Sequence, residues 1–339
     1  MPSILCAAML AVALVTCAWA RVGMMGLFVP YLLMSFAATG IAILVSVFFW
    51  VLVMAKERSD APLRKVVERI RSRAALLLLP TIVLALFLVG YTAAKTAIAF
   101  LVGFGWDQVW TNVDRAMFGD DAWRVAQGLL GVRLMPLYAW FYTVGWGAVF
   151  GVTAGVVAIN AKPRQVGTFY TAMFLTWLVG GWLMALALSA AGPAFTYLFN
   201  PKLAAHFAAL NRGIDAHLLP DNSLRLTQKY LAVSIGSHVA LKGGGISAMP
   251  SMHLGAATIY VLAARKTKWL LPALLFWLTI FLLSAYFGYH YWVDGLVAAG
   301  VAWACWRATE LLFQPTFDDR CNTNNRVSEV NSPLLARDA

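Results

Sequence analysis

Long apolar runs separated by short charged stretches set the pattern of this chain. Each run is long enough, or nearly so, to cross about 30 Å of hydrocarbon as a helix that rises 1.5 Å per residue. Apolar residues on every face of a helix indicate burial in a core or a bilayer. Of the runs, the sixth is the least regular, because only Met252 to Ala264 is unbroken and the preceding Ser-Ala-Met-Pro is needed for a first turn. The pattern predicts eight membrane-spanning helices, near residues 3–20, 27–55, 75–102, 134–160, 166–191, 249–264, 269–288 and 290–313.

The composition agrees with a membrane protein. Hydrophobic residues make up 61% of the 339 residues and charged residues 12%, whereas a typical soluble domain has about 25% charged residues. So few charges cannot cover the surface of a water-soluble fold of this length. The sequence therefore predicts an all-α, polytopic helical bundle in a membrane. Its net charge of +11 comes mainly from residues at the ends of apolar runs, where they set topology and contact anionic lipid, so a nucleic-acid partner is not expected.

Three short basic loops predict the orientation of the bundle. Eight spans place all three loops on one side, and the retention of Lys and Arg in the cytoplasm makes that side, and both termini, cytoplasmic. Two longer polar segments, 103–133 and 192–250, then emerge on the extracytoplasmic face, the first as an amphipathic or interfacial connection. The basic loops contain Lys56, Arg58, Arg64, Lys65, Arg69, Arg71 and Arg73, then Lys162 and Arg164, then Arg265, Lys266 and Lys268.

The N-terminal segment and the cysteines leave two smaller questions. Ala18-Trp19-Ala20 is similar to a signal-peptide cleavage site, but no Lys or Arg precedes the apolar run, so an uncleaved first membrane helix is favoured over a cleaved leader. The four cysteines show no zinc or redox spacing. Neither a metal nor a cofactor is expected.

All five histidines lie between residues 206 and 290, beside the predicted extracytoplasmic face. His253 ends the segment GGGISAMPSMH, in which a flexible glycine run leads through Ser251 and Met252 into a helix. The free backbone N–H groups and positive dipole end of such a helix suit a phosphate.

His290 stands in a second unusual setting, GYHYWVDG, with Asp294 four residues later. If both lie on one helix face, Asp294 can accept a hydrogen bond from one ring nitrogen and leave the other free to attack an electrophile. An ionisable residue in an apolar helix marks a candidate functional site. The alternative is a buried polar pair that locks two helices together.

Together, the two settings resemble the type-2 phosphatidic acid phosphatase superfamily of membrane phosphoryl-transfer enzymes. The resemblance implies a six-helix catalytic domain at residues 75–313. Two N-terminal helices and a basic loop (1–74) precede it and lie outside the resemblance. The cytoplasmic tail after it (314–339) is polar and rich in Asn, Ser and Arg, so we expect it to be disordered. The resemblance also implies that His253 is the acid for the leaving group, His290 the nucleophile and Asp294 the residue that orients His290. The spacing of these motifs and the upstream run DRAMFGDDAW look most like the inositolphosphotransferase branch, which includes inositol phosphorylceramide synthases. The likeness extends over about residues 90–310.

The chain departs from the superfamily pattern at the positive residues that would neutralise the charge of the phosphate. The phosphatases of the superfamily have Ser-Arg before the second histidine, but here the arginine position is Ser284, followed by Ala285, and the Lys-x6-Arg-Pro motif is absent. Other groups must then bind the phosphate. We expect Lys242 beside the glycine run, Lys95 deep in the third apolar run, the Ser251 hydroxyl and the Met252 backbone N–H to do so.

These observations predict an enzyme that acts on a lipid phosphate or phosphodiester through a phosphohistidine, without metal, at the extracytoplasmic face. A headgroup transferase with a polyol or sugar alcohol as acceptor is favoured over a phosphatase of the same superfamily. Two hypotheses from other classes stay open: a transporter or flippase that uses His290 and Asp294 as a proton relay, and a glycosyltransferase that uses Asp120 or Asp121.

Overall fold

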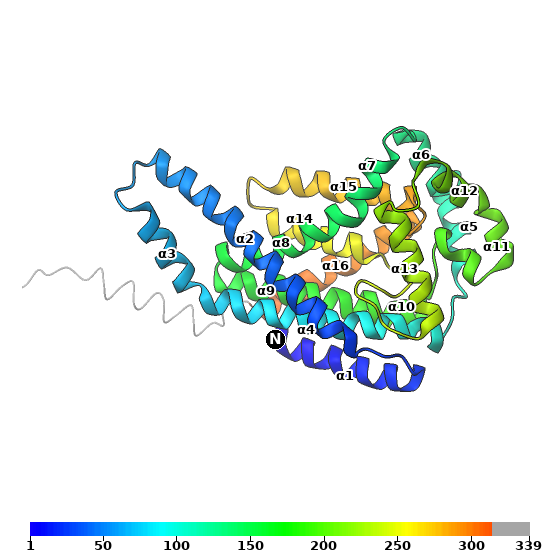
Figure 1. The fold of residues 1–339 in the computed structure, drawn as a ribbon, viewed down its shortest axis with the longest axis horizontal. Helices are drawn as coiled ribbons and strands as arrows, with labels where there is room; N and C mark the ends of the chain where they lie inside the picture. Colours follow the sequence, from blue (N-terminus) through cyan, green and yellow to red (C-terminus); the bar gives the residue numbers. More distant parts are fainter. Residues whose placement is uncertain (314–339) are drawn as a thin grey trace, which may run out of the picture.

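The computed structural model describes residues 1–313, and these residues are almost entirely helical (Figure 1). The tail that the sequence predicts to be disordered, residues 314–339, lies outside the described residues. The first third of the chain forms α1 (Pro2–Ala20), η1 (Met25–Leu27), α2 (Phe28–Lys56), α3 (Pro62–Ser72), α4 (Ala74–Leu101), α5 (Asp107–Phe118) and α6 (Ala122–Leu130).

The rest of the described chain continues the helical pattern. Two of its turns, η2 and η3, are π-helical insertions within longer α-helical runs, a feature often found at functional sites. The elements are α7 (Met135–Trp140), η2 (Phe141–Gly145), α8 (Trp146–Asn160), α9 (Pro163–Leu178), η3 (Val179–Met184), α10 (Ala185–Ala187), η4 (Pro193–Leu198), α11 (Pro201–His206), α12 (Ala208–His217), α13 (Ser223–Ser237), α14 (Met252–Ala264), α15 (Leu270–Tyr286) and α16 (Trp292–Leu312).

Several of these helices can cross a membrane. Within residues 1–313, five helical runs are long and apolar enough to do so: α1, η1–α2, α4, α7–α8 and α9–α10. Two shorter apolar helices, α14 and α15, follow. Every apolar run in the sequence coincides with one helix or with consecutive helices, so the prediction of an all-α multi-pass membrane protein is confirmed. The total of eight spans and the division into domains stay predictions.

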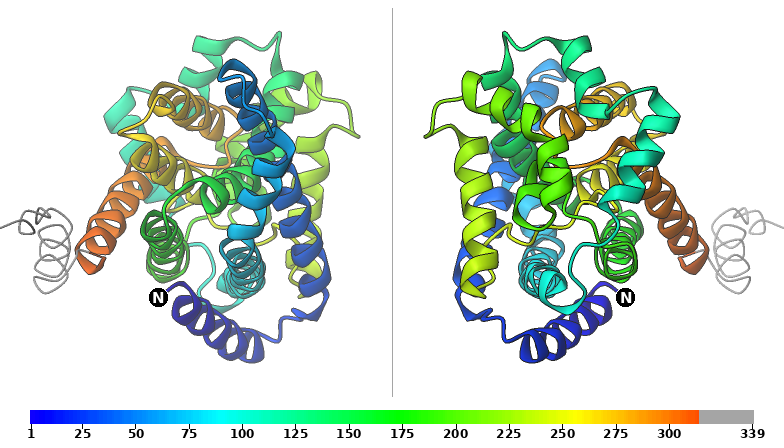
Figure 2. Two further views of the ribbon diagram at one scale, coloured as in Figure 1. Left: turned by 90° about the vertical axis from the view of Figure 1, so that its left-hand side faces the viewer. Right: turned by 90° about the vertical axis from the view of Figure 1, so that its right-hand side faces the viewer.

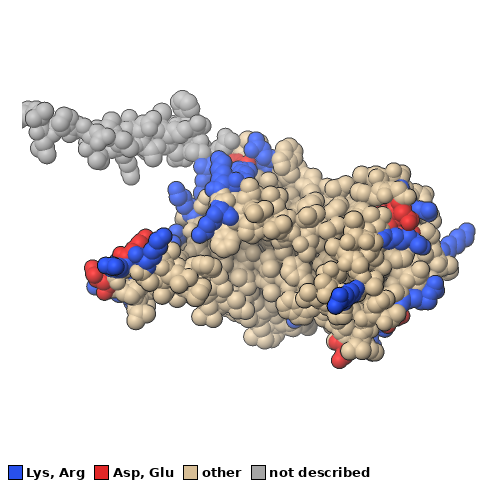
Figure 3. All heavy atoms as spheres, turned by 90° about the horizontal axis from the view of Figure 1, so that it is seen from above, with Lys and Arg blue, Asp and Glu red and all other residues tan. Residues whose placement is uncertain are grey.

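Charged side chains on the face drawn in Figure 3 gather at the two ends of the long axis, and the middle is nearly free of them. Helices such as α1, α4, α15 and α16 run roughly along this axis, with α3 near one end of the molecule and α5, α6, α11 and α12 near the other (Figure 1). The connections that the sequence assigns to opposite faces therefore lie at opposite ends. Which end faces the cytoplasm is a prediction from the positive loops.

Local structure differs from the sequence prediction in three places. The basic loop contains the amphipathic helix α3, because Leu63, Val66, Val67 and Ile70 recur at helical spacing among its Lys and Arg residues. The segment 192–250 includes η4, α11, α12 and α13. The expectation that Ser-Ala-Met-Pro forms the first turn of the sixth span is wrong: α14 begins at Met252, because Ser251 is extended and acts as its N-cap residue.

The centre of the bundle is the packing of α14 against α9, α15 and α16. The N-terminal helices cover it from outside: α1 lies along α4, and α2 packs on α8 and α4 (Figures 1 and 2). Small residues permit this close approach, as is usual between membrane helices. A Cβ on Gly155 of α8 would lie 2.6 Å from the Cβ of Ala42 on α2, and one on Gly90 of α4 would lie 3.1 Å from the backbone of α1.

Candidate active site

The fold brings the two motif histidines into direct contact. His253 is the second residue of α14, and His290 lies in the loop between α15 and α16. The Nε2 atom of His290 is 3.4 Å from the Nδ1 atom of His253, and the ring centroids are 5.5 Å apart. The two imidazoles, 37 residues apart in sequence, thus form one site.

The position and tautomer of His290 are fixed by the main chain. Its backbone N–H donates to Ser284 O at 3.2 Å, and its Nδ1 lies 2.7 Å from Ala248 O. A carbonyl oxygen only accepts, so Nδ1 must carry the proton and donate it to Ala248 O. The lone pair is then on Nε2, the nitrogen that faces His253.

Asp294 lies next to His290 but does not accept its ring hydrogen bond. The expectation that both residues share one helix face is wrong, because α16 begins at Trp292 and His290 precedes it. The turn nevertheless places Asp294 Oδ2 3.6 Å from His290 Nδ1. The same oxygen accepts a hydrogen bond of 2.9 Å from Tyr291 N, and the side chain is fully buried. Asp294 therefore places a carboxyl group beside the imidazole, while the Ala248 carbonyl fixes the tautomer of the ring.

His253 is enclosed by aromatic rings. Tyr142 from η2 stacks on it at a centroid distance of 5.1 Å, and Trp146 from α8 lies at 4.3 Å. The residue before α14 links the two motifs through the main chain, since Ser251 N donates to Asp294 O at 3.1 Å. Motif positions that are distant in sequence are thus joined by backbone hydrogen bonds.

Both histidines open onto a cavity of about 640 Å³, and two lysines line it with them. Lys95 reaches it from α4, and Lys242 from the loop between α13 and α14. The volume is in the range of a site for a small organic ligand. The other residues along its wall include Tyr142, Thr143, Trp146, Phe195, Tyr230, Gly243, Gly245, Ser247 and Tyr289.

Ser251 and Met252, which the sequence places at the phosphate, are not among the residues that line this cavity. The Met252 side chain packs on η3, where a Cβ on Gly180 would lie 3.0 Å from its terminal methyl carbon. Ser251 is fully buried, and within the described residues its hydroxyl has no hydrogen-bond partner. Their proposed phosphate contacts stay untested predictions.

The glycine run preceding α14 is shaped by close packing. Gly245 has φ +87°, and a Cβ there would lie 2.9 Å from Lys95 Cγ and 3.0 Å from Thr96 N. Only glycine tolerates both this backbone conformation and this approach. The run therefore lies directly on the turn of α4 that carries Lys95.

Two carboxylates of α5 support the site, in a role that was not predicted from the sequence. Asp107 accepts hydrogen bonds from Ala191 N at 2.9 Å and Gly192 N at 2.8 Å. Asp114 accepts from the first two N–H groups of α16, on Trp292 at 3.0 Å and Val293 at 2.9 Å. Burial raises the pKa of Asp114 to about 7, although these N–H bonds act to lower it. The available signal was their seven-residue spacing, which puts both on one helix face.

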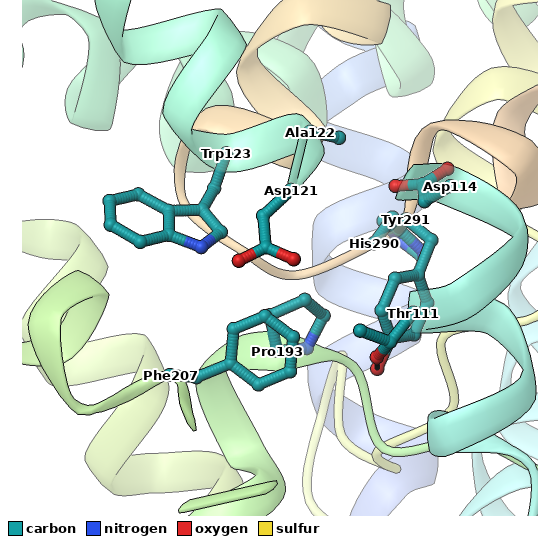
Figure 4. Close-up of a pocket in the computed structure, with 9 residues that line it drawn as sticks. All are labelled: Thr111, Asp114, Asp121, Ala122, Trp123, Pro193, Phe207, His290 and Tyr291. Atoms are coloured by element: carbon teal, nitrogen blue, oxygen red, sulfur yellow. Dashed lines mark hydrogen bonds between the residues drawn. The ribbon is translucent and has the colours of Figure 1, made fainter. Parts of the chain in front are cut away.

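Behind His290 lies a second, small cavity of about 10 Å³, room for about one water molecule (Figure 4). Asp121 and Trp123 point toward it, and Asp114 and Tyr291 also line it. Asp121 is paired with His206 of α11, whose Nε2 is 2.9 Å from Asp121 Oδ2. His206 thus has a carboxylate partner distant in sequence. Within residues 1–313 no three His, Cys, Asp or Glu side chains are grouped as metal ligands.

The site thus consists of two histidines in contact, a carboxyl group beside one of them and a cavity lined by two lysines, within a multi-pass helical bundle. In a comparison with known families, the profile of the PAP2 superfamily matches residues 111–308, more than half of the chain, and the chain belongs to this superfamily. Its members are generally metal-independent phosphatases and phosphotransferases that act on phosphate substrates of the lipid type. No curated protein and no solved structure matches the chain. The resemblance to the inositolphosphotransferase branch stays a prediction.

Proposed function

We propose that this protein transfers the phosphoryl-containing headgroup of a lipid phosphate or phosphodiester to an alcohol through a phosphohistidine. The observation that supports this most directly is the contact between His253 and His290 at the wall of a cavity that also contains two lysines. A nucleophile, a proton donor and positive charge for the phosphate oxygens are then within one site.

In the first step, the Nε2 lone pair of His290 attacks phosphorus and the bond to the leaving oxygen breaks. His253, which is protonated at the start of this step, gives its proton to that oxygen and becomes neutral. The free Nε2 lone pair, imposed by the Ala248 carbonyl, makes His290 the nucleophile of the pair. Because the two nitrogens are only 3.4 Å apart, the rings must separate as the phosphoryl group enters from the cavity.

In the second step, an alcohol or water attacks the phosphorus of the phosphohistidine and the P–Nε2 bond breaks. His253, now neutral, takes the proton of the attacking hydroxyl, so both histidines return to their initial states. Asp294, 3.6 Å from Nδ1, stabilises the positive imidazole ring between the two steps. Lys95 and Lys242 bind the non-bridging oxygens of the phosphate. Their charges replace those of the two motif arginines of the phosphatases, which this chain lacks.

Transfer to an alcohol is favoured over hydrolysis by the sequence. The arginine position of the phosphatase motif is Ser284, and the motif spacing resembles that of the inositolphosphotransferases. Polyols and sugar alcohols are the acceptors that we propose. The cavity lies near the end of the bundle opposite α3, since Lys95 is close to the C-terminal end of α4. With the basic loops in the cytoplasm, the site is then extracytoplasmic.

The test uses purified protein in detergent with a radiolabelled lipid phosphate, with and without myo-inositol or a sugar alcohol. We expect a phosphorylated histidine on rapid acid-free quenching and a phosphorylated alcohol as product. His290→Ala abolishes both, and His253→Ala abolishes turnover, while both variants keep the thermal melting temperature of the folded protein. Free phosphate as the sole product with every alcohol would overturn the transferase, and full activity of either variant would overturn the mechanism.

A further inference from the structure

The helical hairpin of α1 and α2 precedes the part of the chain that matches the superfamily profile, yet it is bonded to the loop that lines the cavity. Gly23, between the two helices, forms a β-bridge with Val239. Its N–H donates to His238 O at 3.0 Å, and its carbonyl accepts from Ala240 N at 2.8 Å. The hairpin thus holds the chain just before the glycine run.

A second bond reaches the glycine run itself. The backbone N–H of Gly243 donates to the hydroxyl oxygen of Tyr31 on α2 at 2.8 Å. That hydroxyl also hydrogen-bonds the Thr92 hydroxyl on α4 at 2.5 Å. Tyr31 is 3% exposed and Thr92 also 3%, so water does not compete for either hydroxyl. Tyr31 therefore joins α2, α4 and the loop at one point.

The residues next to this point are those that line the cavity. Lys242 directly precedes Gly243, and Gly245 packs on Lys95, one turn of α4 beyond Thr92. Farther along the same loop, Ala248 O accepts the hydrogen bond that sets the tautomer of His290. The place of Gly243 thus determines where Lys242 stands relative to Lys95 and the histidines.

We propose that Tyr31 is a positioning residue for phosphate binding, and that the N-terminal hairpin acts as a clamp that holds Lys242 over the cavity. The proposal rests on the function proposed above. The clamp comprises Gly23 and Tyr31 of the hairpin, Thr92 of α4 and the loop 238–245. Tyr31 touches no substrate in this scheme and acts through the loop.

Tyr31→Phe tests the clamp, because it removes the hydroxyl and keeps the ring. Gly243 N–H is left without its partner, so we expect KM for the lipid phosphate to rise about fivefold, the factor of one net hydrogen bond. kcat should stay within about twofold, since the histidines are not displaced. The matched control is Tyr170→Phe, which removes another buried hydroxyl that donates to Ala154 O at 3.0 Å, away from the cavity.

A double-mutant cycle separates positioning from general stability. If Tyr31 acts through Lys242, Tyr31→Phe should add little to the KM of Lys242→Gln, whereas independent effects would multiply. Should Tyr31→Phe not fold, Thr92→Val removes the partner of the Tyr31 hydroxyl and is expected to raise KM in the same direction. Multiplicative effects, or equal KM changes in Tyr31→Phe and Tyr170→Phe, would overturn the positioning role.

Hydrogen–deuterium exchange tests the clamp without any assay of activity. In Tyr31→Phe, peptides from residues 238–248 should exchange faster than in the wild-type protein, and in Tyr170→Phe they should not. Unchanged exchange would overturn the clamp even if the enzyme is active. A wild-type protein without phosphoryl transfer would overturn the proposed function and leave faster exchange as evidence for the clamp.

Discussion

Replacement of Asp294 by asparagine separates two roles that a carboxylate beside a catalytic histidine can have. One is to hold the tautomer of the ring, and the other is to stabilise the positive charge that the ring gains on reaction. Here Ala248 O already accepts from His290 Nδ1 at 2.7 Å, whereas Asp294 Oδ2 is 3.6 Å away. Asp294→Asn should therefore remove the charge and leave the tautomer unchanged.

The size of the effect follows from the separation. Two unit charges 3.6 Å apart interact by about 4–5 kcal/mol at an effective dielectric constant of about 20. The variant recovers part of this stabilisation through the dipole of its amide group and through relaxation of the surrounding structure. We expect kcat to fall by about 10²–10³-fold, because about 1.4 kcal/mol corresponds to a factor of ten. KM should change little, since the imidazole is neutral until it is phosphorylated.

The assay measures kcat and KM with a lipid phosphate, together with the amount of phosphohistidine trapped in a single turnover. The amide introduced by Asp294→Asn keeps an oxygen that can accept from Tyr291 N, so the variant should fold. Asp221→Asn, at an exposed position, is the control for loss of one carboxylate. A fall of less than tenfold, or a change confined to KM, would refute the electrostatic role. A fall of about 10⁴-fold, typical of a lost tautomer in serine hydrolase triads, would instead show that Asp294 and not Ala248 orients the ring.

Two further predictions concern charge and the support of the site. Lys95→Gln should raise KM for the lipid phosphate about tenfold or more, because one charged hydrogen bond to the phosphate is lost. The control, Lys202→Gln at an exposed position, should leave KM unchanged. Steady-state kinetics measure both values, and equal KM values in the two variants would contradict a contact between Lys95 and the phosphate. Asp114→Asn should lower the melting temperature, because an amide offers one acceptor oxygen to the two N–H groups that Asp114 now accepts from. The folded-state pKa of Asp114 is raised from 3.8 to about 7. Its stabilising effect is therefore present at low pH and is lost as the pH rises through about 7. The difference in melting temperature between the wild-type protein and Asp114→Asn should consequently narrow from pH 5 to pH 8. A constant difference in melting scans over that range would show that Asp114 does not titrate there.

The fold was predictable where one kind of side chain dominates a long run. The helices α4 and α16 begin and end within two residues of the apolar runs 75–102 and 290–313, because a run of that length has few other ways to satisfy its backbone in a bilayer. The helix α3 was missed because its basic residues obscured an apolar stripe of four. Its existence depends on periodicity rather than on composition.

In the candidate site, the side chains that line the cavity were predictable from the sequence, and the groups that position them were not. His253, His290, Lys95 and Lys242 were identified from residue type and setting, and the structure places all four on one cavity. The groups that hold them are largely main-chain atoms whose partners are distant in sequence. No local pattern shows that Ala248 O will face an imidazole 42 residues away, or that Gly243 N will meet a hydroxyl 212 residues away.

This division between side chains and main chain has a physical basis. The loop that contains Ala248 is held on one side by Ala190 O, which accepts from Ala248 N at 2.8 Å, and the neighbouring 191–192 amides are held by Asp107. On the other side, Ser251 N donates to the carbonyl of Asp294. Because buried backbone groups must be paired, each of these bonds fixes the loop whatever side chain occupies position 248. The His290 ring is thus oriented by main-chain bonds, and among the groups that hold them Asp107 is a side chain that mutation can remove. Loss of Asp107 should therefore disturb His290 more than any substitution of Ala248 that the packing can accept.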